Sequence, residues 1–262
     1  MKVLAIFNVK GGTGKTTTAI CLSYALASLE KKTLLIDMDP QGNASKTFGH
    51  YQEDECTIKN LLDDTDTGIT QIQQVIYPSQ YPNLDVIPCE IRLGSIEKQM
   101  VISEFVHGES QIAKLRNLLQ TIKGQYDYVV IDCGPAAESL INLNALVAAD
   151  YVFAPVKSDS YSSDGMEYML EILQTARKVN HNLKYGGAIQ VEYAGFNVDK
   201  VARDILEDAI GEHLLKTKIS RSTVVPEATY MTEPIGAYKP KSKVAQEYKA
   251  LADEVLSIVN DR

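Results

Sequence analysis

The chain has 262 residues, of which 45% are hydrophobic and 23% charged, so it has an ordinary globular composition and enough length to bury a sizeable core. Its net charge of −8 argues against a dedicated nucleic-acid domain, which is usually basic, and any DNA binding would need a local basic patch. Four cysteines without a C-x-x-C pair and four histidines without ligand spacing indicate neither a disulfide framework nor a zinc site. We expect a cytoplasmic protein, since no apolar run approaches a membrane span and the N-terminus reaches a glycine-rich motif too early for a signal peptide.

The pattern along the chain predicts strands that alternate with helices. Apolar runs predict seven strands, at residues 2–9, 32–39, 84–88, 126–134, 150–156, 185–193 and 214–219. Helical spacing of apolar residues follows the first strand and recurs at residues 111–122, 162–179 and 198–210, while residues 42–82 are more polar and predict short helices and loops. This alternation favours one α/β domain over residues 1–262, with a mainly parallel twisted sheet and helices on both faces.

The first strand leads into "NVKGGTGKTTTA", residues 8–19. Gly14, Lys15 and Thr16 fit the end of a phosphate-binding loop, but Val9 stands where its first glycine is expected, and Lys10 is a second lysine. In such a loop the lysine contacts phosphates and the Thr16 hydroxyl contacts Mg²⁺. An ordinary glycine-rich turn is a poor alternative, because a strand, three glycines, a Lys-Thr pair and a helix follow in order.

Acidic residues end two of the predicted strands. Asp132 closes "YVVID", where P-loop proteins place an acid that holds Mg²⁺ through water. Asp37 and Asp39 close "LLIDMD" and, being two residues apart, are expected to point the same way if the strand continues that far. Two acids directed at one phosphate site suggest metal coordination and placement of an attacking water. "DPQGN" is also a turn signal, which explains Pro40 and Gly42 better than it explains the acids.

Together, "KGGTGKTT", "LLIDMDPQGNAS" and "YVVIDC" resemble the deviant Walker A ATPases, the family that includes ParA, Soj and MinD, and "DPQGNAS" is most similar to the short Soj-type members. The resemblance implies ATP and Mg²⁺ as cofactors and a homodimer that ATP closes, in which Lys10 would reach the ATP of the neighbouring subunit. It implies catalytic roles for Lys10, Lys15 and Asp39, and metal binding by Thr16, Asp39 and Asp132. The nucleotide-binding residues would be Lys10, Gly11, Gly12, Thr13, Gly14, Lys15, Thr16 and Thr17.

The implied function is partition of plasmid or chromosomal DNA, with nonspecific DNA binding in the ATP state, a ParB-like partner that stimulates hydrolysis, and association with the nucleoid. The chain departs from the family in reading "DCGPA" from Asp132, and in carrying Gly195 and Val224 where Soj-type members often have arginines. The remaining candidates for DNA contact, which could equally be solvated surface charges, are Lys216, Lys218, Arg221, Lys239, Lys241 and Lys243.

Three alternatives stay open at this point. A membrane-surface ATPase like MinD is disfavoured by the weakly basic ending "EVLSIVNDR". An iron–sulfur reductase would need Cys133 and Cys89 to bridge a cluster between subunits. A ParA-like switch that positions a cargo other than DNA is favoured by the missing arginines. The sequence does not place the adenine site, which we expect in the second half of the chain.

Overall fold

The computed structural model describes residues 1–51, 55–63, 69–108, 110–158 and 163–261. Its eight strands are β1 Lys2–Ile6, β2 Thr33–Met38, β3 Tyr77–Pro78, β4 Leu84–Ile87, β5 Tyr128–Cys133, β6 Tyr151–Lys157, β7 Lys184–Tyr193 and β8 Leu214–Ser220. They form one sheet in the order β3-β4-β2-β5-β1-β6-β7-β8. Every pairing is parallel except that of β3 with β4. The α/β class and the seven predicted strands are confirmed, and the two-residue β3 is the strand that the pattern missed.

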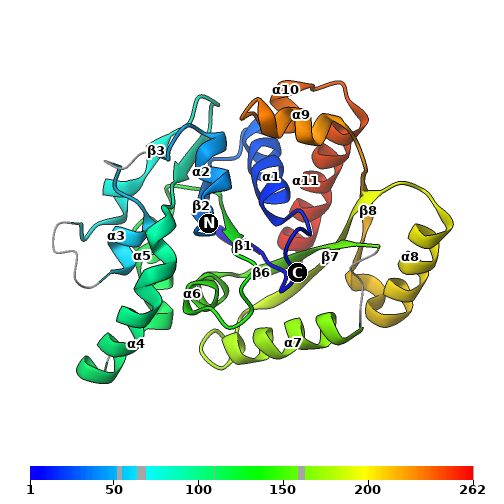
Figure 1. The fold of residues 1–262 in the computed structure, drawn as a ribbon. Coiled ribbons are helices and arrows are strands. Elements are labelled where there is room, and N and C mark those ends of the chain that lie inside the picture. The colour runs from blue at the N-terminus through cyan, green and yellow to red at the C-terminus, as the bar shows by residue number, and fades with distance from the viewer. Residues whose placement is uncertain (52–54, 64–68, 109, 159–162, 262) are drawn as a thin grey trace.

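Helices cover both faces of this sheet (Figure 1). On one face α1 and α11 lie side by side with α9 and α10 near them, and on the other lie α6 and α7. The bounds are α1 Lys15–Ser28, α2 Asn43–Thr47, α3 Ile58–Leu62, α4 Ile96–His107, α5 Lys114–Gln120, α6 Leu140–Ala148, α7 Ser163–Arg177, α8 Asn197–Ile210, α9 Val224–Tyr230, α10 Ile235–Tyr238 and α11 Lys243–Asp261. Single turns of 3-10 helix are η1 Ile72–Val75, η2 Ile91–Ser95, η3 Gln111–Ala113 and η4 Gly211–His213.

The predicted helices differ from the observed ones mainly at their ends. The helix predicted at residues 111–122 is a 3-10 turn, η3, followed by α5, which ends at Gln120. The helix predicted at 162–179 is α7, and residue 162 lies outside the described residues. The polar stretch 42–82 holds α2, α3, η1 and β3 in its described part, as short elements were predicted there.

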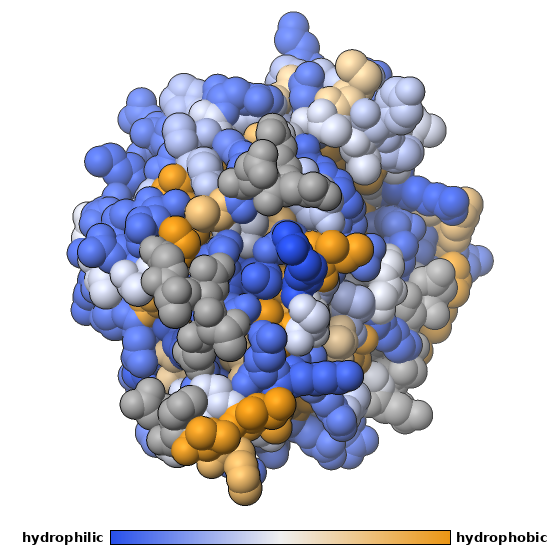
Figure 2. All heavy atoms as spheres, turned by 60° about the vertical axis from the view of Figure 1, so that its left-hand side comes forward, coloured by the Kyte–Doolittle hydropathy of each residue, from blue (hydrophilic) through white to orange (hydrophobic). Residues whose placement is uncertain are grey.

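The central strands are buried on both faces, which explains their continuous apolar sequences. One layer of core lies between the sheet and α1 with α11, and another between the sheet and α5, α6 and α7. None of the described helices is long and apolar enough to cross a membrane. Figure 2 shows a largely hydrophilic face with apolar residues gathered at its lower edge. The carboxyl ends of β1, β2 and β5 meet at one edge of the sheet, where α1 begins.

Candidate functional site

The loop between β1 and α1 has the backbone of an anion cradle. Gly12 and Gly14 have φ angles of +71° and +79°, a left-handed conformation that glycine adopts without strain. Gly14 caps the N-terminus of α1, and no side chain caps the free N–H groups of its first turn. A helix N-terminus that begins in such a loop presents these donors and a partial positive charge to a phosphate group.

Lys15 supplies a charge within this loop. Its side chain is buried, with 6% exposed, and its ammonium donates to the Lys10 carbonyl at 2.9 Å. Burial lowers the pKa of Lys15, and the nearby Asp132, Cys133 and Asp39 act against that shift. A buried ammonium held by a single backbone carbonyl retains donors for an oxyanion.

Lys10, the second lysine of the motif, stands at the mouth of the loop. Its N–H donates to Asn8 Oδ1 at 3.0 Å, and the Asn8 amide donates to the Pro155 carbonyl at 2.8 Å. The start of the loop is thereby fixed to β6. Lys10 is half-buried, whereas Gly11 and Gly12 beside it are exposed. These residues lie at the molecular surface, where a second subunit could reach them.

Asp132 lies at the end of β5, in register with Ile6 of β1 and Asp37 of β2. It is fully buried, and neither carboxylate oxygen has a hydrogen-bond partner within the described residues. Burial and the nearby Asp37 raise its pKa well above the usual range, while the Thr16 hydroxyl and the Lys15 ammonium oppose the shift. A buried, unpartnered carboxylate that faces a threonine hydroxyl is a donor set that suits Mg²⁺. No group of three His, Cys, Asp or Glu side chains among the described residues could hold a metal alone, so phosphate and water would complete the coordination.

Asp37 is not available to bind a cation beside Asp132. This differs from the expectation that Asp37 and Asp39 would both be directed at the phosphates. The Asp37 carboxylate accepts from Asp39 N at 3.1 Å, Ser45 N at 2.8 Å and Ser45 Oγ at 2.7 Å. Burial raises the pKa of Asp37 to about 6. The strand ends at Met38, and Asp39 begins the turn that follows, in which Gly42 N donates to the Asp39 carbonyl at 2.8 Å, so the period-two rule no longer applies at Asp39. Asp37 therefore shapes the turn that carries Asp39.

Asp39 is the first residue of that turn, and 8% of its surface is exposed. Its Oδ1 accepts from Gln41 N at 3.0 Å. The loop after β5 lies against it, since a Cβ on Gly134 would be 3.7 Å from the Asp39 Cα and Oδ1. Asp39 is also close enough to Lys15 to influence that lysine's pKa. The structure thus brings Lys15, Thr16, Asp39 and Asp132 together at one edge of the sheet.

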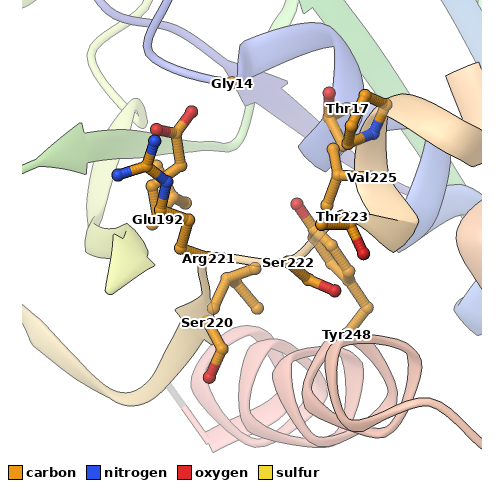
Figure 3. Close-up of a pocket in the computed structure, with 12 residues that line it drawn as sticks. Gly14, Thr17, Glu192, Ser220, Arg221, Ser222, Thr223, Val225 and Tyr248 are labelled. Carbon is orange, nitrogen blue, oxygen red and sulfur yellow. The ribbon is translucent and has the colours of Figure 1, made fainter. Parts of the chain in front are cut away.

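A cavity of about 520 Å³ adjoins the phosphate loop, and the sequence did not predict it. Gly14 and Thr17 form one side, and the segment that follows β8 forms another. Figure 3 shows the side chains of Glu192 and Arg221 close together on one side and Thr17, Thr223 and Tyr248 on the other. No motif marks this lining, because it is assembled from α1, the ends of β7 and β8, α9 and α11. Arg221, a candidate for DNA contact, lies in this cavity wall.

The lysines considered for DNA contact are dispersed, and several have acidic or aromatic neighbours. Lys218 lies over the Tyr193 ring at 4.5 Å, Lys239 is 4.0 Å from Glu227, and Lys243 is 3.6 Å from Glu247. Lys216 and Lys241 are exposed. Nothing in this arrangement tests a DNA contact.

The two cysteines that an iron–sulfur cluster would require are buried. Cys89 is 1% exposed with its Sγ 3.1 Å from the Asp39 carbonyl, and Cys133 is fully buried. Burial raises the pKa of both thiols. Thiols inside the core do not reach a surface where a second subunit could share a cluster with them.

Several known proteins are similar in sequence to this chain. A family model described as "AAA domain" (AAA_31) matches residues 1–185. The chain is 34% identical to the sporulation initiation inhibitor protein Soj of Bacillus subtilis over 97% of its own length and 98% of that protein. It is also 34% identical to the chromosome partitioning protein ParA of Caulobacter vibrioides, over 100% of this chain and 96% of that one.

A solved structure shares the fold at comparable coverage. The septum site-determining protein MinD of Pyrococcus horikoshii OT3, complexed with Mg-ADP, superposes with a TM-score of 0.76 and 26% identity, covering 99% of this chain and 98% of that one. With the phosphate loop, the buried Asp132 and relatives of this kind along its whole length, the chain belongs to the ParA/MinD superfamily of P-loop ATPases.

Proposed function

We propose that residues 1–262 act as one ATPase domain that binds ATP and Mg²⁺, dimerises in the ATP state and couples hydrolysis to the partition of DNA. The observation that carries this proposal is the meeting of Lys15, Thr16, Asp39 and the unpartnered Asp132 around the N-terminus of α1. These groups can bind a triphosphate, hold a divalent cation and orient water at one place.

In this proposal the phosphates lie on the N–H groups from Gly12 to Thr17, with Lys15 on the transferring end. The base would enter the 520 Å³ cavity, because Gly14 and Thr17 form the boundary between that cavity and the loop. Thr16 directly, and Asp132 and Asp39 through water, would hold Mg²⁺, which neutralises charge that develops on the phosphate oxygens. Asp39 would orient the attacking water.

Lys10 would act on the ATP of a second subunit, as a cation supplied in trans. Its position beside the exposed Gly11 and Gly12 supports this role, and a cation of this kind is worth about 10³–10⁵ in rate in other phosphoryl-transfer enzymes. Static light scattering with a slowly hydrolysed ATP analogue tests the dimer. We expect a monomer-to-dimer shift in mass that Lys15→Ala abolishes together with ATP binding, and an unchanged mass would contradict the ATP-closed dimer.

The ATP-bound dimer would bind DNA without sequence preference and respond to a ParB-like partner, which would place it on the nucleoid in the cytoplasm. The relatives named Soj and ParA support this proposal. A gel shift with plasmid DNA, with and without ATP, tests it directly.

A second candidate is a ParA-like switch that positions a cargo other than DNA. The observation in its favour is local: Gly195 presents no side chain, and Val224 is 7% exposed, so neither position offers a cation to a phosphate backbone. ATP-dependent dimerisation without any shift of plasmid DNA would favour this second function.

A further inference from the structure

The chain that follows β4 lies against the residue that we propose orients the attacking water. β4 runs parallel to β2, with Ile87 in register with Ile36, so the segments that follow the two strands leave the sheet at the same edge. Cys89 comes two residues after β4 and is buried. Its Sγ donates to the Asp39 carbonyl at 3.1 Å and also lies 3.4 Å from the Glu90 carbonyl. The thiol therefore joins two neighbouring loops at the site.

Four hydrogen bonds form a closed ring through Asp39. The Asp39 N–H donates to one carboxylate oxygen of Asp37 at 3.1 Å. The other oxygen of Asp37 accepts from the Ser45 hydroxyl at 2.7 Å, and that hydroxyl accepts from Cys89 N at 2.8 Å. The Cys89 thiol closes the ring on the Asp39 carbonyl. All four residues are buried, so little water is present to replace a bond of the ring.

The remaining bonds of Asp39 come from its own turn. Gly42 N donates to the Asp39 carbonyl at 2.8 Å, and Gln41 N donates to Asp39 Oδ1 at 3.0 Å. These local bonds fix the shape of the turn, but they do not fix its place relative to the sheet. The bonds to Asp37 and from Cys89 do so, because one of these residues lies in β2 and the other directly follows β4.

We propose that Cys89 is a positioning residue for ATP hydrolysis, whose thiol acts on the Asp39 carbonyl and so holds the Asp39 carboxylate where it can orient water. The inference rests on the proposed role of Asp39. A thiol of ordinary pKa, about 8–9, is protonated at neutral pH, and burial raises the pKa of Cys89, so its S–H remains a donor. Hydrolysis depends on such support, because even a small displacement of a group that orients a reactant lowers the rate.

Steady-state hydrolysis over a series of ATP concentrations tests the proposal. Cys89→Ala removes the donor, so kcat should fall about two- to fivefold, the factor that a weak hydrogen bond is worth. KM for ATP and the dimer formed with a slowly hydrolysed analogue should not change, because the phosphate loop is untouched. Cys89→Ser keeps a donor at the same position and should recover most of the wild-type kcat, which a residue that only filled space would not require.

Cys21→Ala is the matched control. Cys21 lies in α1, is 3% exposed and is hydrogen-bonded to the backbone of Ile235, so the change removes an equally buried thiol away from Asp39. It should lower stability about as much as Cys89→Ala and keep the wild-type kcat. A second control places Cys89→Ala in the Asp39→Ala variant. There the thiol has no carboxylate to position, and its removal should leave the residual rate unchanged.

The outcomes separate this inference from the proposed role of Asp39. If Asp39→Ala is slow but Cys89→Ala keeps the kcat of Cys21→Ala, Asp39 retains its role and the inference is overturned. The inference is also overturned if Cys89→Ser is as slow as Cys89→Ala, or if loss of the thiol slows Asp39→Ala as much as it slows wild type. If Asp39→Ala itself hydrolyses ATP at the wild-type rate, the role of Asp39 is wrong and that of Cys89 is wrong with it.

Discussion

At the scale of single residues, three aspartates near the phosphate loop differ only in their surroundings, and the surroundings give them different tasks. Asp37 accepts one hydrogen bond from Asp39 N and two from Ser45 of α2, so both of its carboxylate oxygens are bonded within the protein. Asp132 is buried without a partner and is the group best prepared for a cation. Asp39 keeps part of its surface exposed beside Lys15, where water can reach it.

Asp39→Ala is therefore expected to separate binding from hydrolysis. The variant should bind ATP and form the ATP-dependent dimer, because the phosphate loop and Asp132 are unchanged. Turnover should fall about 10²-fold or more, the usual cost of removing a group that orients or activates water. Phosphate release and nucleotide binding measured on one preparation check this, with Asp204→Ala on the exposed side of α8 as control. Hydrolysis at the wild-type rate would show that Asp39 has been given the wrong role.

Ser45 should matter for stability although it touches no ligand. Its hydroxyl donates to Asp37 and accepts from Cys89 N at 2.8 Å, and the site is fully buried. Ser45→Ala leaves one buried acceptor and one buried donor less satisfied, at a cost of about 1–3 kcal/mol. Urea unfolding should show this as a lower midpoint. Thr47→Ala in the same helix removes a hydroxyl whose bond to Asn43 is exposed, and it should change stability little.

At the scale of elements, α4 is connected to the site through the loop that follows β5. Glu97 of α4 accepts from the Ser139 hydroxyl and from Ile141 N at 3.3 Å, and Ser139 caps α6. Asn142 holds the other end of the loop, donating to the Gly134 carbonyl at 3.0 Å. Since Gly134 lies against Asp39, a shift of α4 would displace Asp39, the residue that we propose orients the attacking water.

Glu97→Ala is expected to slow hydrolysis about tenfold without weakening ATP binding, because a small displacement of a catalytic group is costly in rate whereas the phosphate loop itself is untouched. Glu97→Gln keeps an oxygen acceptor and should recover most of the rate. Gln99→Ala, on the exposed side of the same helix, serves as control. Equal rates for all three variants in a steady-state assay would mean that Glu97 does not position this loop.

The elements also show how far sequence reasoning extends. The central strands and α1 were predictable because continuous apolar runs and a glycine-rich loop are local signals. Asp37 was misjudged because two of the three hydrogen bonds that it accepts come from Ser45, eight residues away on the next helix. The cavity beside Gly14 was missed because its walls come from five elements that no local pattern connects. The exposed apolar side of α4, with Val101, Ile102 and Phe105, likewise becomes visible only once Met100 and Ile96 are known to be buried.

At the scale of the whole molecule, the net charge of −8 and a DNA-binding function oppose each other. At physiological salt the Debye length is about 8 Å, so a local cluster of lysines can attract phosphates despite distant carboxylates. Lys239 and Lys241 lie in the segment that joins α10 to α11, and both are exposed. Arg221 is a poorer probe of DNA binding than the sequence suggested, because it lines the cavity proposed for the base.

We therefore expect ATP-dependent, sequence-independent DNA binding that weakens steeply with salt. About six phosphate contacts would lose about 10³ in affinity between 50 and 200 mM salt. Lys239→Glu combined with Lys241→Glu should weaken binding and flatten that slope while leaving ATP hydrolysis intact. The control combines Lys32→Glu with Lys123→Glu, two exposed lysines just before β2 and β5 at the opposite end of those strands from the phosphate site, and changes the net charge equally. If both pairs weaken binding to the same extent, overall charge and not a local patch controls it. If wild type with ATP and Mg²⁺ binds no DNA even at 50 mM salt, partition of DNA is the wrong function and a different cargo takes its place.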